Sequence, residues 1–252
     1  MIDYLVFTLS ANLGAMGEFG GHERRSSLDW PGRSAIIGLL GAALGLRRSD
    51  DFSELEQLKM AVAVFGDTTP LRDYHTVQTV PTAKARRPQS RPQALRDARQ
   101  DLNTIITLRD YRCTPLFGVA LWTLMDAGDL LARVQQALLQ PGFVLYLGRK
   151  SCALSAPLAP RRVQAVQPQQ ALHHIQLPPW RQNARAQRML SDAVIDAPRH
   201  ELRQDQALDR QRWHFASRKV AVVPVSIAPC RKAGRSVCAA SSASRRCALP
   251  SA

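Results

Sequence analysis

The first third of the chain alternates between strand-like and helix-like hydrophobic patterns. Apolar and β-prone residues fill Ile2–Ser10, which predicts a strand, and a glycine-rich turn follows it. Pro31 stands where a helix typically begins, and the apolar run over residues 34–46 predicts that helix. The run contains Gly38, Gly41 and Gly45. Because glycine weakens a helix, its repeated use indicates close packing against a sheet. Lys59–Phe65 predicts a second strand.

The same two patterns return after residue 103. Residues 104–112 and 116–123 predict two strands that pair as a hairpin across a short connection containing Pro115. Residues 126–139 carry apolar side chains at helical spacing and predict a second helix. Residues 143–147 predict a last strand. The order is strand, helix, strand, basic insertion, two strands, helix, strand. It indicates an α+β fold close to a ferredoxin-like βαββαβ unit with an inserted arm, the sheet platform of RNA-recognition modules.

A basic segment separates these two halves. Residues 72–112 contain nine arginines and lysines, and Pro81, Pro88 and Pro92 interrupt any helix there. An insertion of this length inside a compact domain is usually functional or disordered. Two interpretations stay open, namely an arm that wraps a phosphate chain and a solvated, flexible arm.

The hydrophobic periodicity weakens after residue 160. We expect residues 1–160 to form the ferredoxin-like domain, with the insertion at about 76–103, and residues 161–225 to form a β-rich or irregular extension. Residues 226–252 are basic, lack acidic residues and are expected to be a disordered tail.

The net charge of the chain limits the kinds of partner that the protein is expected to bind. The 252 residues include 34 Lys and Arg against 20 Asp and Glu, a net charge of +14, which favours a polyanionic partner such as nucleic acid. The longest apolar run is too short to span a bilayer, so no membrane association is expected. The N-terminus carries Asp3 in place of a cationic segment, and the five cysteines are odd in number and widely spaced. These features favour a cytoplasmic protein with free thiols, without a metal site or a cofactor.

The segment after the last predicted strand carries the sharpest chemical signal. Gly148 permits close approach of a phosphate, the following N–H groups can bind an anion, and Arg149 and Lys150 supply charge, with Ser151 beside them. The spacing differs from that of a nucleotide-binding P-loop. Tyr146, just before the turn, could stack on a base.

Two further positions could contact RNA. Arg109 and Tyr111 alternate along a predicted strand and therefore share one face, where they could hold a phosphate and stack a base. His75, in Asp73-Tyr74-His75, could act in acid–base cleavage of RNA. A hydrogen-bonded structural role for His75 is favoured, because no motif places a second catalytic group near it.

Several motifs, in order, carry a family resemblance over about residues 2–220. They are Tyr4–Leu9, Trp30–Gly45, Leu71–Val77, Leu108–Cys113, Val119–Trp122, Tyr146–Cys152 and His214–Arg218. With these motifs the sequence resembles the CasD family, whose members are subunits of the type I-E CRISPR Cascade surveillance complex in the RAMP superfamily.

The resemblance implies a non-catalytic subunit in antiviral defence. Such a subunit binds the 5′ handle of the crRNA, caps the filament of Cascade backbone subunits and contacts the large PAM-reading subunit; target DNA is reached only through the complex. The insertion at about 76–103 would be the family's β-hairpin thumb. The residues expected at the RNA are Arg33, His75, Arg109, Tyr111, Tyr146, Gly148, Arg149, Lys150 and Ser151.

The alternative is a metal-independent endoribonuclease that matures CRISPR repeat RNA. It would need a general base and a charge stabiliser, for which His75 with Lys84 or Lys150 are the candidates. We favour binding without catalysis.

Overall fold

The computed structural model describes residues 1–17, 21, 23–81, 83–84, 87–124, 129–192, 196–212 and 214–229. The helices are α1 (Arg33–Ala43), α2 (Ser53–Glu56), α3 (Arg91–Ala98), α4 (Leu130–Leu139), α5 (Pro168–Leu172) and the 3₁₀ turn η1 (Pro179–Arg181). The strands are β1 (Ile2–Ser10), β2 (Leu13–Gly14), β3 (Met16–Gly17), β4 (Arg24–Arg25), β5 (Ser27–Leu28), β6 (Lys59–Phe65), β7 (Thr69–Thr79), β8 (Asn103–Cys113), β9 (Leu116–Trp122), β10 (Arg161–Ala165), β11 (Ala186–Ser191), β12 (Arg199–Asp209) and β13 (His214–Ile227).

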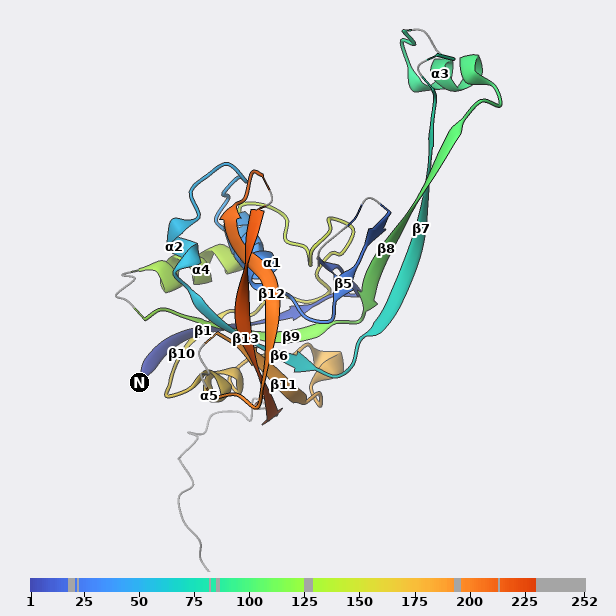
Figure 1. The fold of residues 1–252 in the computed structure, drawn as a ribbon. Coiled ribbons are helices and arrows are strands. Elements are labelled where there is room, and N and C mark those ends of the chain that lie inside the picture. Colours follow the sequence, from blue (N-terminus) through green and yellow to red (C-terminus); the bar gives the residue numbers. More distant parts are fainter. Residues whose placement is uncertain are drawn as a thin grey trace, which may run out of the picture.

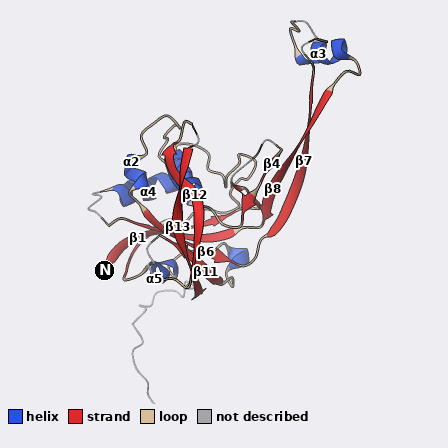
Figure 2. Ribbon diagram, in the orientation of Figure 1, coloured by secondary structure: helices blue, strands red, loops and turns tan. Residues whose placement is uncertain are grey.

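A seven-stranded antiparallel sheet forms the body of the molecule, with strand order β10-β1-β9-β6-β11-β13-β12. Helices α1, α2 and α4 cover one side and α5 covers the other (Figures 1 and 2). The predicted mixed α/β architecture with antiparallel sheets is therefore confirmed. No helix among the described residues is both long and apolar enough to cross a membrane.

Side chains alternate along the central strands and fill a separate core on each side of the sheet. Phe7 and Val119 face α1 and α4, whose apolar stripe includes Val134. Val6 and Trp122 face α5, where Leu172 is fully buried. Because both faces are covered, the central strands read as nearly continuous apolar runs in the sequence.

A long two-stranded hairpin projects from this body (Figure 1). Strands β7 and β8 pair antiparallel over eleven residues, from Thr69 opposite Cys113 to Thr79 opposite Asn103, and α3 lies at the tip. Short strands β2 and β4 flank β8 near its base. The expectation that prolines exclude a helix in the insertion is wrong for α3, because Pro92 lies in the first turn, where its missing N–H is not needed.

Two local expectations are corrected by the structure. Strands β8 and β9 do not pair with each other, because Thr114, with φ of 49°, and Pro115 turn the chain from the small sheet into the main one. Residues 143–147 form no strand, since the N–H groups of Gly142 and Phe143 donate to carbonyls at the end of α1. The strand that pairs with β1 is β10 instead.

The glycines of the first helix do not pack on the sheet as expected. A Cβ at Gly41 would lie 2.3 Å from the Phe52 ring, and one at Gly142 would lie 2.9 Å from the Gly45 Cα, whereas a Cβ at Gly38 would meet nothing within 4 Å. Gly41 and Gly45 therefore allow close approach of neighbouring loops, and not of the sheet. Helix α1 ends at Ala43 rather than at residue 46, and Gly45 has a positive φ of 77°.

The remaining expectations concern the C-terminal part. Residues 161–227 supply β10–β13, and the strands on both sides of residue 160 belong to one sheet. Ile227 is buried at the end of β13, and residues 230–252 of the predicted tail lie outside the described residues. Helix α4 begins at Leu130, and residues 126–128 of the predicted helix also lie outside the described residues. Cys113 and Cys152 are free thiols, as predicted.

Buried ion pairs fix the start of α1 to the β12–β13 hairpin. Asp205 accepts hydrogen bonds from the Arg33 backbone N–H at 2.6 Å and from the Arg218 guanidinium, whose Nε lies 2.6 Å away. Asp192 contacts the guanidinium groups of both arginines. The Arg33 side chain also donates to the backbone carbonyls of Glu56 and Leu58.

We expect Asp205→Ala to lower the free energy of unfolding by about 3–5 kcal/mol, because it leaves buried cationic donors without their carboxylate. The control is Arg199→Ala, which removes an exposed ion pair to Glu201 and should cost about 1 kcal/mol or less. Denaturant unfolding followed by circular dichroism measures both. Equal losses in the two variants would contradict the structural role given to Asp205.

Candidate nucleic-acid interface

The base of the projecting hairpin gathers most of the basic residues singled out by the sequence. Arg109 and Tyr111 share one face of β8, as predicted, and lie opposite Asp73 and Leu71 of β7. Tyr111 is buried, whereas Arg109 is partly exposed. Arg25 of β4 lies beside Arg109 in the parallel pairing of β4 with β8.

A tight turn brings a second set of residues to the same place. The Leu147 N–H donates to the Cys152 carbonyl at 2.8 Å, and the Cys152 N–H donates to the Arg149 carbonyl at 2.8 Å. The Leu147 carbonyl accepts from the Ala15 N–H at 3.0 Å, which fastens the turn to the glycine-rich segment after β1. Lys150 is exposed at the turn.

Gly148 is required by the geometry of this turn. Its φ is +88°, in the region that favours glycine, and a Cβ at this position would lie 1.8 Å from the Ala15 carbonyl oxygen. The sequence indicated that Gly148 permits close approach of a phosphate. In the structure the close neighbour is the chain's own backbone.

Arg149 joins the turn to the hairpin. Its guanidinium carbon lies 4.5 Å from the centroid of the Tyr111 ring, a cation–π contact, and its Nη2 donates to the Arg25 carbonyl at 3.4 Å. We call Arg25, Arg109, Tyr111, Arg149 and Lys150 the basic cluster. It combines residues from β4, β8 and the turn, which are far apart in the sequence.

Two donors of the basic cluster are not used within the described part of the chain. The Arg109 Nε and the Arg149 Nη1 are buried, and neither has a hydrogen-bond partner there. A buried donor without an acceptor costs free energy. Both arginines are partly exposed, and guanidinium groups bind phosphate and base oxygens in a fixed geometry; a small shift of the side chains would let such oxygens reach the two buried nitrogens.

The opposite face of the hairpin base is also basic but internally paired. Asp110 lies 2.7 Å from the Arg24 guanidinium and 2.8 Å from that of Arg72. The hydrogen bond from Arg72, together with that from Arg24, lowers the pKa of Asp110 to about 2. One carboxylate thus holds two arginines, and this face keeps a net positive charge.

The other predicted residues lie outside the basic cluster. Arg33 is buried in the ion-pair network at the start of α1, so its guanidinium does not face solvent. His75 lies further along β7, and its Nε2 is 2.6 Å from Asp73 Oδ2. Tyr146 is half-buried and forms an isolated bridge with Ala153, while Ser151 is exposed beside Lys150.

The structure also shows which residues sequence reasoning missed. Arg24, Arg25 and Arg72 complete the two faces of the hairpin base. The doublet Arg24-Arg25 was the available signal, but β4 has two residues and pairs in parallel with a distant strand, so no local pattern reveals it. Among the described residues, no group of three or more His, Cys, Asp or Glu could hold a metal ion.

These features define a mixed α/β protein with antiparallel sheets and a basic surface at the base of a projecting hairpin. Comparison with known proteins specifies the class. The family model described as CRISPR-associated protein (Cas_Cas5) matches residues 4–221. The CRISPR system Cascade subunit CasD of Escherichia coli (strain K12) is 36% identical over 190 residues, which cover 68% of this chain and 76% of that protein.

The chain therefore belongs to the Cas5 family of CRISPR-associated proteins, and the resemblance found in the sequence is confirmed. Solved structures share its fold. A chain of a CRISPR RNA-guided surveillance complex superimposes with a TM-score of 0.64 at 24% identity, covering 89% of this chain and 90% of its own. A crystal structure of a Cas protein superimposes with a TM-score of 0.53 at 25% identity, and the match covers 88% of this chain and 95% of the Cas protein.

We expect Gly148→Ala to destabilise the protein by about 2 kcal/mol, because alanine strains the positive φ and its Cβ collides with Ala15. The matched control is Gly38→Ala in α1, where a Cβ meets nothing within 4 Å; it should stabilise the helix by about 1 kcal/mol. Thermal unfolding compares the two variants. A neutral Gly148→Ala would show that the turn is not held as described.

Proposed function

We propose that the protein is a non-catalytic Cascade subunit that binds the 5′ handle of the crRNA at the basic cluster. The observation that carries the proposal is the contact of Arg149 with Tyr111 beside Arg25 and Arg109, where buried guanidinium donors have no acceptor within the described residues. A single-stranded phosphate chain supplies such acceptors, and the exposed Lys150 adds charge at the rim.

The order of the strands supports the ferredoxin-like fold that the family resemblance implies. The central strands run β10-β1-β9-β6, with α1 after β1 and α4 after β9, which corresponds to the strand order 4-1-3-2 of a ferredoxin-like unit. The β7–β8 hairpin, inserted after the second of these strands, is the counterpart of the thumb. We retain the proposed division into a first domain, an extension and a tail with two shifts: β10 belongs to the first domain as its fourth strand, and the extension continues to Ile227 at the end of β13.

The hairpin also offers a surface for a neighbouring subunit. Its exposed large apolar side chains are Leu71, Tyr74, Val77, Ile105 and Ile106, with exposed fractions of 42–68%. Apolar side chains on a projecting ribbon favour burial against another protein. We assign this surface to the Cascade backbone subunit at the filament end. In the proposed role the protein also contacts the large PAM-reading subunit, and it reaches target DNA only through the complex. We place this role in the cytoplasm.

The binding role is favoured over RNA cleavage by the environment of the candidate catalytic groups. The His75 ring contacts Asp73, and Lys84 forms an ion pair with Asp101 at 2.8 Å beyond the end of β7. Lys150 belongs to the turn fastened to Ala15. These groups come from separate parts of the hairpin and its base, whereas acid–base catalysis requires groups that converge on one phosphate.

We expect Arg109→Ala to weaken binding of the crRNA 5′ handle by about 1–3 kcal/mol, because a charge-assisted hydrogen bond is lost. Lys150→Ala should also weaken this binding. Affinity should fall steeply with salt, and less steeply in either variant. Fluorescence anisotropy with labelled handle RNA measures this, with Arg199→Ala as a control that removes an exposed charge on β12. Unchanged affinity in both variants would remove the basic cluster from the RNA site.

Incubation of the purified protein with CRISPR repeat RNA should give retention without cleavage, with or without divalent metal. Gel analysis of end-labelled RNA detects any product. His75→Ala should leave the RNA pattern unchanged. Cleavage by the wild-type protein that disappears in His75→Ala would establish the endoribonuclease alternative in place of binding alone.

A further inference from the structure

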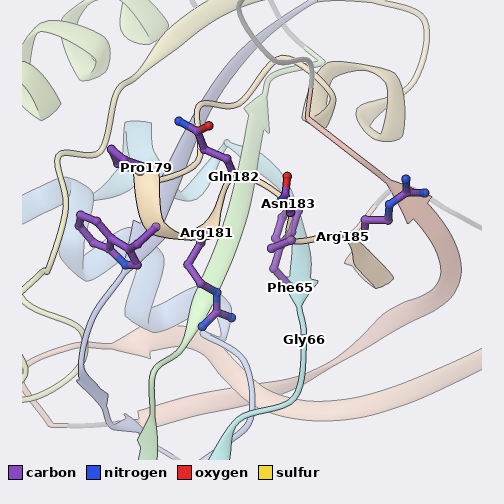
Figure 3. Close-up of a pocket in the computed structure, with 9 residues that line it drawn as sticks. Phe65, Gly66, Pro179, Arg181, Gln182, Asn183 and Arg185 are labelled. Carbon is purple, nitrogen blue, oxygen red and sulfur yellow. The ribbon is translucent and has the colours of Figure 1, made fainter.

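A pocket on the body of the protein shares no residue with the basic cluster. It has a volume of about 590 Å³ and is formed by the end of β6, at Phe65 and Gly66, and by residues 179–185 around η1 (Figure 3). This volume lies in the range of sites that hold small organic ligands. None of its lining residues carries a carboxylate, and two of them are arginines.

The pocket presents an aromatic side chain that the fold does not bury. Trp180 is 62% exposed, although tryptophan is among the side chains that gain most from burial. It follows Pro178 and Pro179, and the Arg181 N–H donates to the Pro178 carbonyl at 2.9 Å. Prolines restrict the backbone of this turn, so the point from which the indole extends is set before a ligand binds.

Two arginines line the pocket, and their side chains extend in different directions. Arg181 extends from η1 toward Gly66, and Arg185 extends to the other side of Asn183 (Figure 3). A Cβ at Gly66, whose φ is +75°, would lie 3.7 Å from the Arg181 Nη2, so the glycine keeps this approach open. Within the described residues, neither arginine takes part in an ion pair. Both are thus available to a bound anion.

An exposed indole beside unpaired guanidinium groups matches one ligand chemistry. Aromatic rings stack on nucleobases, and arginines bind the adjoining phosphates, which is how single strands are held without sequence preference. An acidic peptide would use the arginines but leave the indole without a planar partner. We infer that this pocket binds one unpaired nucleotide of a single-stranded nucleic acid, with the base on Trp180 and the phosphate on Arg181, the arginine next to it in the sequence.

This second contact does not depend on the proposed handle site. The test therefore uses the full-length protein carrying Arg109→Ala and Lys150→Ala, so that failure of either idea is seen separately. The probes are fluorescein-labelled pentamers of uridylate and of thymidylate, measured by anisotropy. Binding of both indicates recognition of base and phosphate alone, whereas binding of only one identifies RNA or DNA as the source; each of these results supports the pocket.

Trp180→Ala and Arg181→Ala should each weaken pentamer binding about tenfold, and Trp180→Phe should retain most of the affinity because a ring remains. Arg47→Ala is the control, since Arg47 is an exposed arginine on the loop between α1 and α2 and does not line the pocket. Circular dichroism confirms that the variants are folded. A pentamer with 5-bromouridine should crosslink, on irradiation, to the peptide containing Trp180.

Three results would overturn the inference. The first is that neither pentamer binds the protein. The second is that Trp180→Ala binds as tightly as the parent, or that the crosslinks map elsewhere. The third is that a pentaglutamate peptide displaces the pentamer as effectively as unlabelled oligonucleotide, since the pocket would then select negative charge without a base.

Discussion

Repulsion among arginines is the constraint under which this protein folds, and shared carboxylates are the interaction that meets it. Asp110 pairs with Arg24 and Arg72, and Asp192 pairs with Arg33 and Arg218. Glu56 and Glu201 likewise each contact two arginines. Because acids are fewer than bases, each carboxylate placed between two guanidinium groups stabilises more of the structure than it would in a single pair. Within the described residues, Arg109 and Arg149 at the hairpin base are among the arginines that share no such carboxylate.

This distribution separates two uses of arginine in one chain. In the network of Asp192 and Asp205 the guanidinium groups are buried and fully engaged, so Arg33 and Arg218 fix α1 against the β12–β13 hairpin. At the basic cluster, Arg109 and Arg149 keep donors that the described chain does not use. Arginines that acidic residues surround therefore stabilise the packing of the protein. Arginines without acidic neighbours stay available for binding a ligand.

The sequence predicted the strands, helices and basic insertion well, because these depend on local patterns. Ile2–Ser10 and Lys59–Phe65 form strands as expected, and Arg109 and Tyr111 share a face, since alternation decides the direction of side chains in a strand. The strand expected at residues 143–147 failed for a non-local reason. Its first backbone donors bind the end of α1, a contact that no window of sequence contains.

The candidate site likewise contains residues that a local sequence pattern predicts and residues that only non-local contacts bring there. Arg149 and Lys150 were found because they follow a glycine in a recognisable turn, whereas Arg33 sits in an equally suggestive motif but is buried by residues more than 150 positions away. Arg24 and Arg25 join the site only through their pairing with β8. Residues that reach a site through tertiary pairing leave no periodic trace in the sequence.

The projecting hairpin has a thermodynamic consequence beyond the contacts it offers. Strand β4 flanks β8 at Leu108 and Arg109, and β2 flanks it at Arg112 and Cys113; among the described residues, the outer part of the ribbon pairs only with itself. A two-stranded ribbon is marginally stable in water on its own. A partner that buried Val77 and Ile106, as proposed above, would therefore supply part of the free energy that orders the hairpin, and its net affinity would be lower than the contact area alone implies.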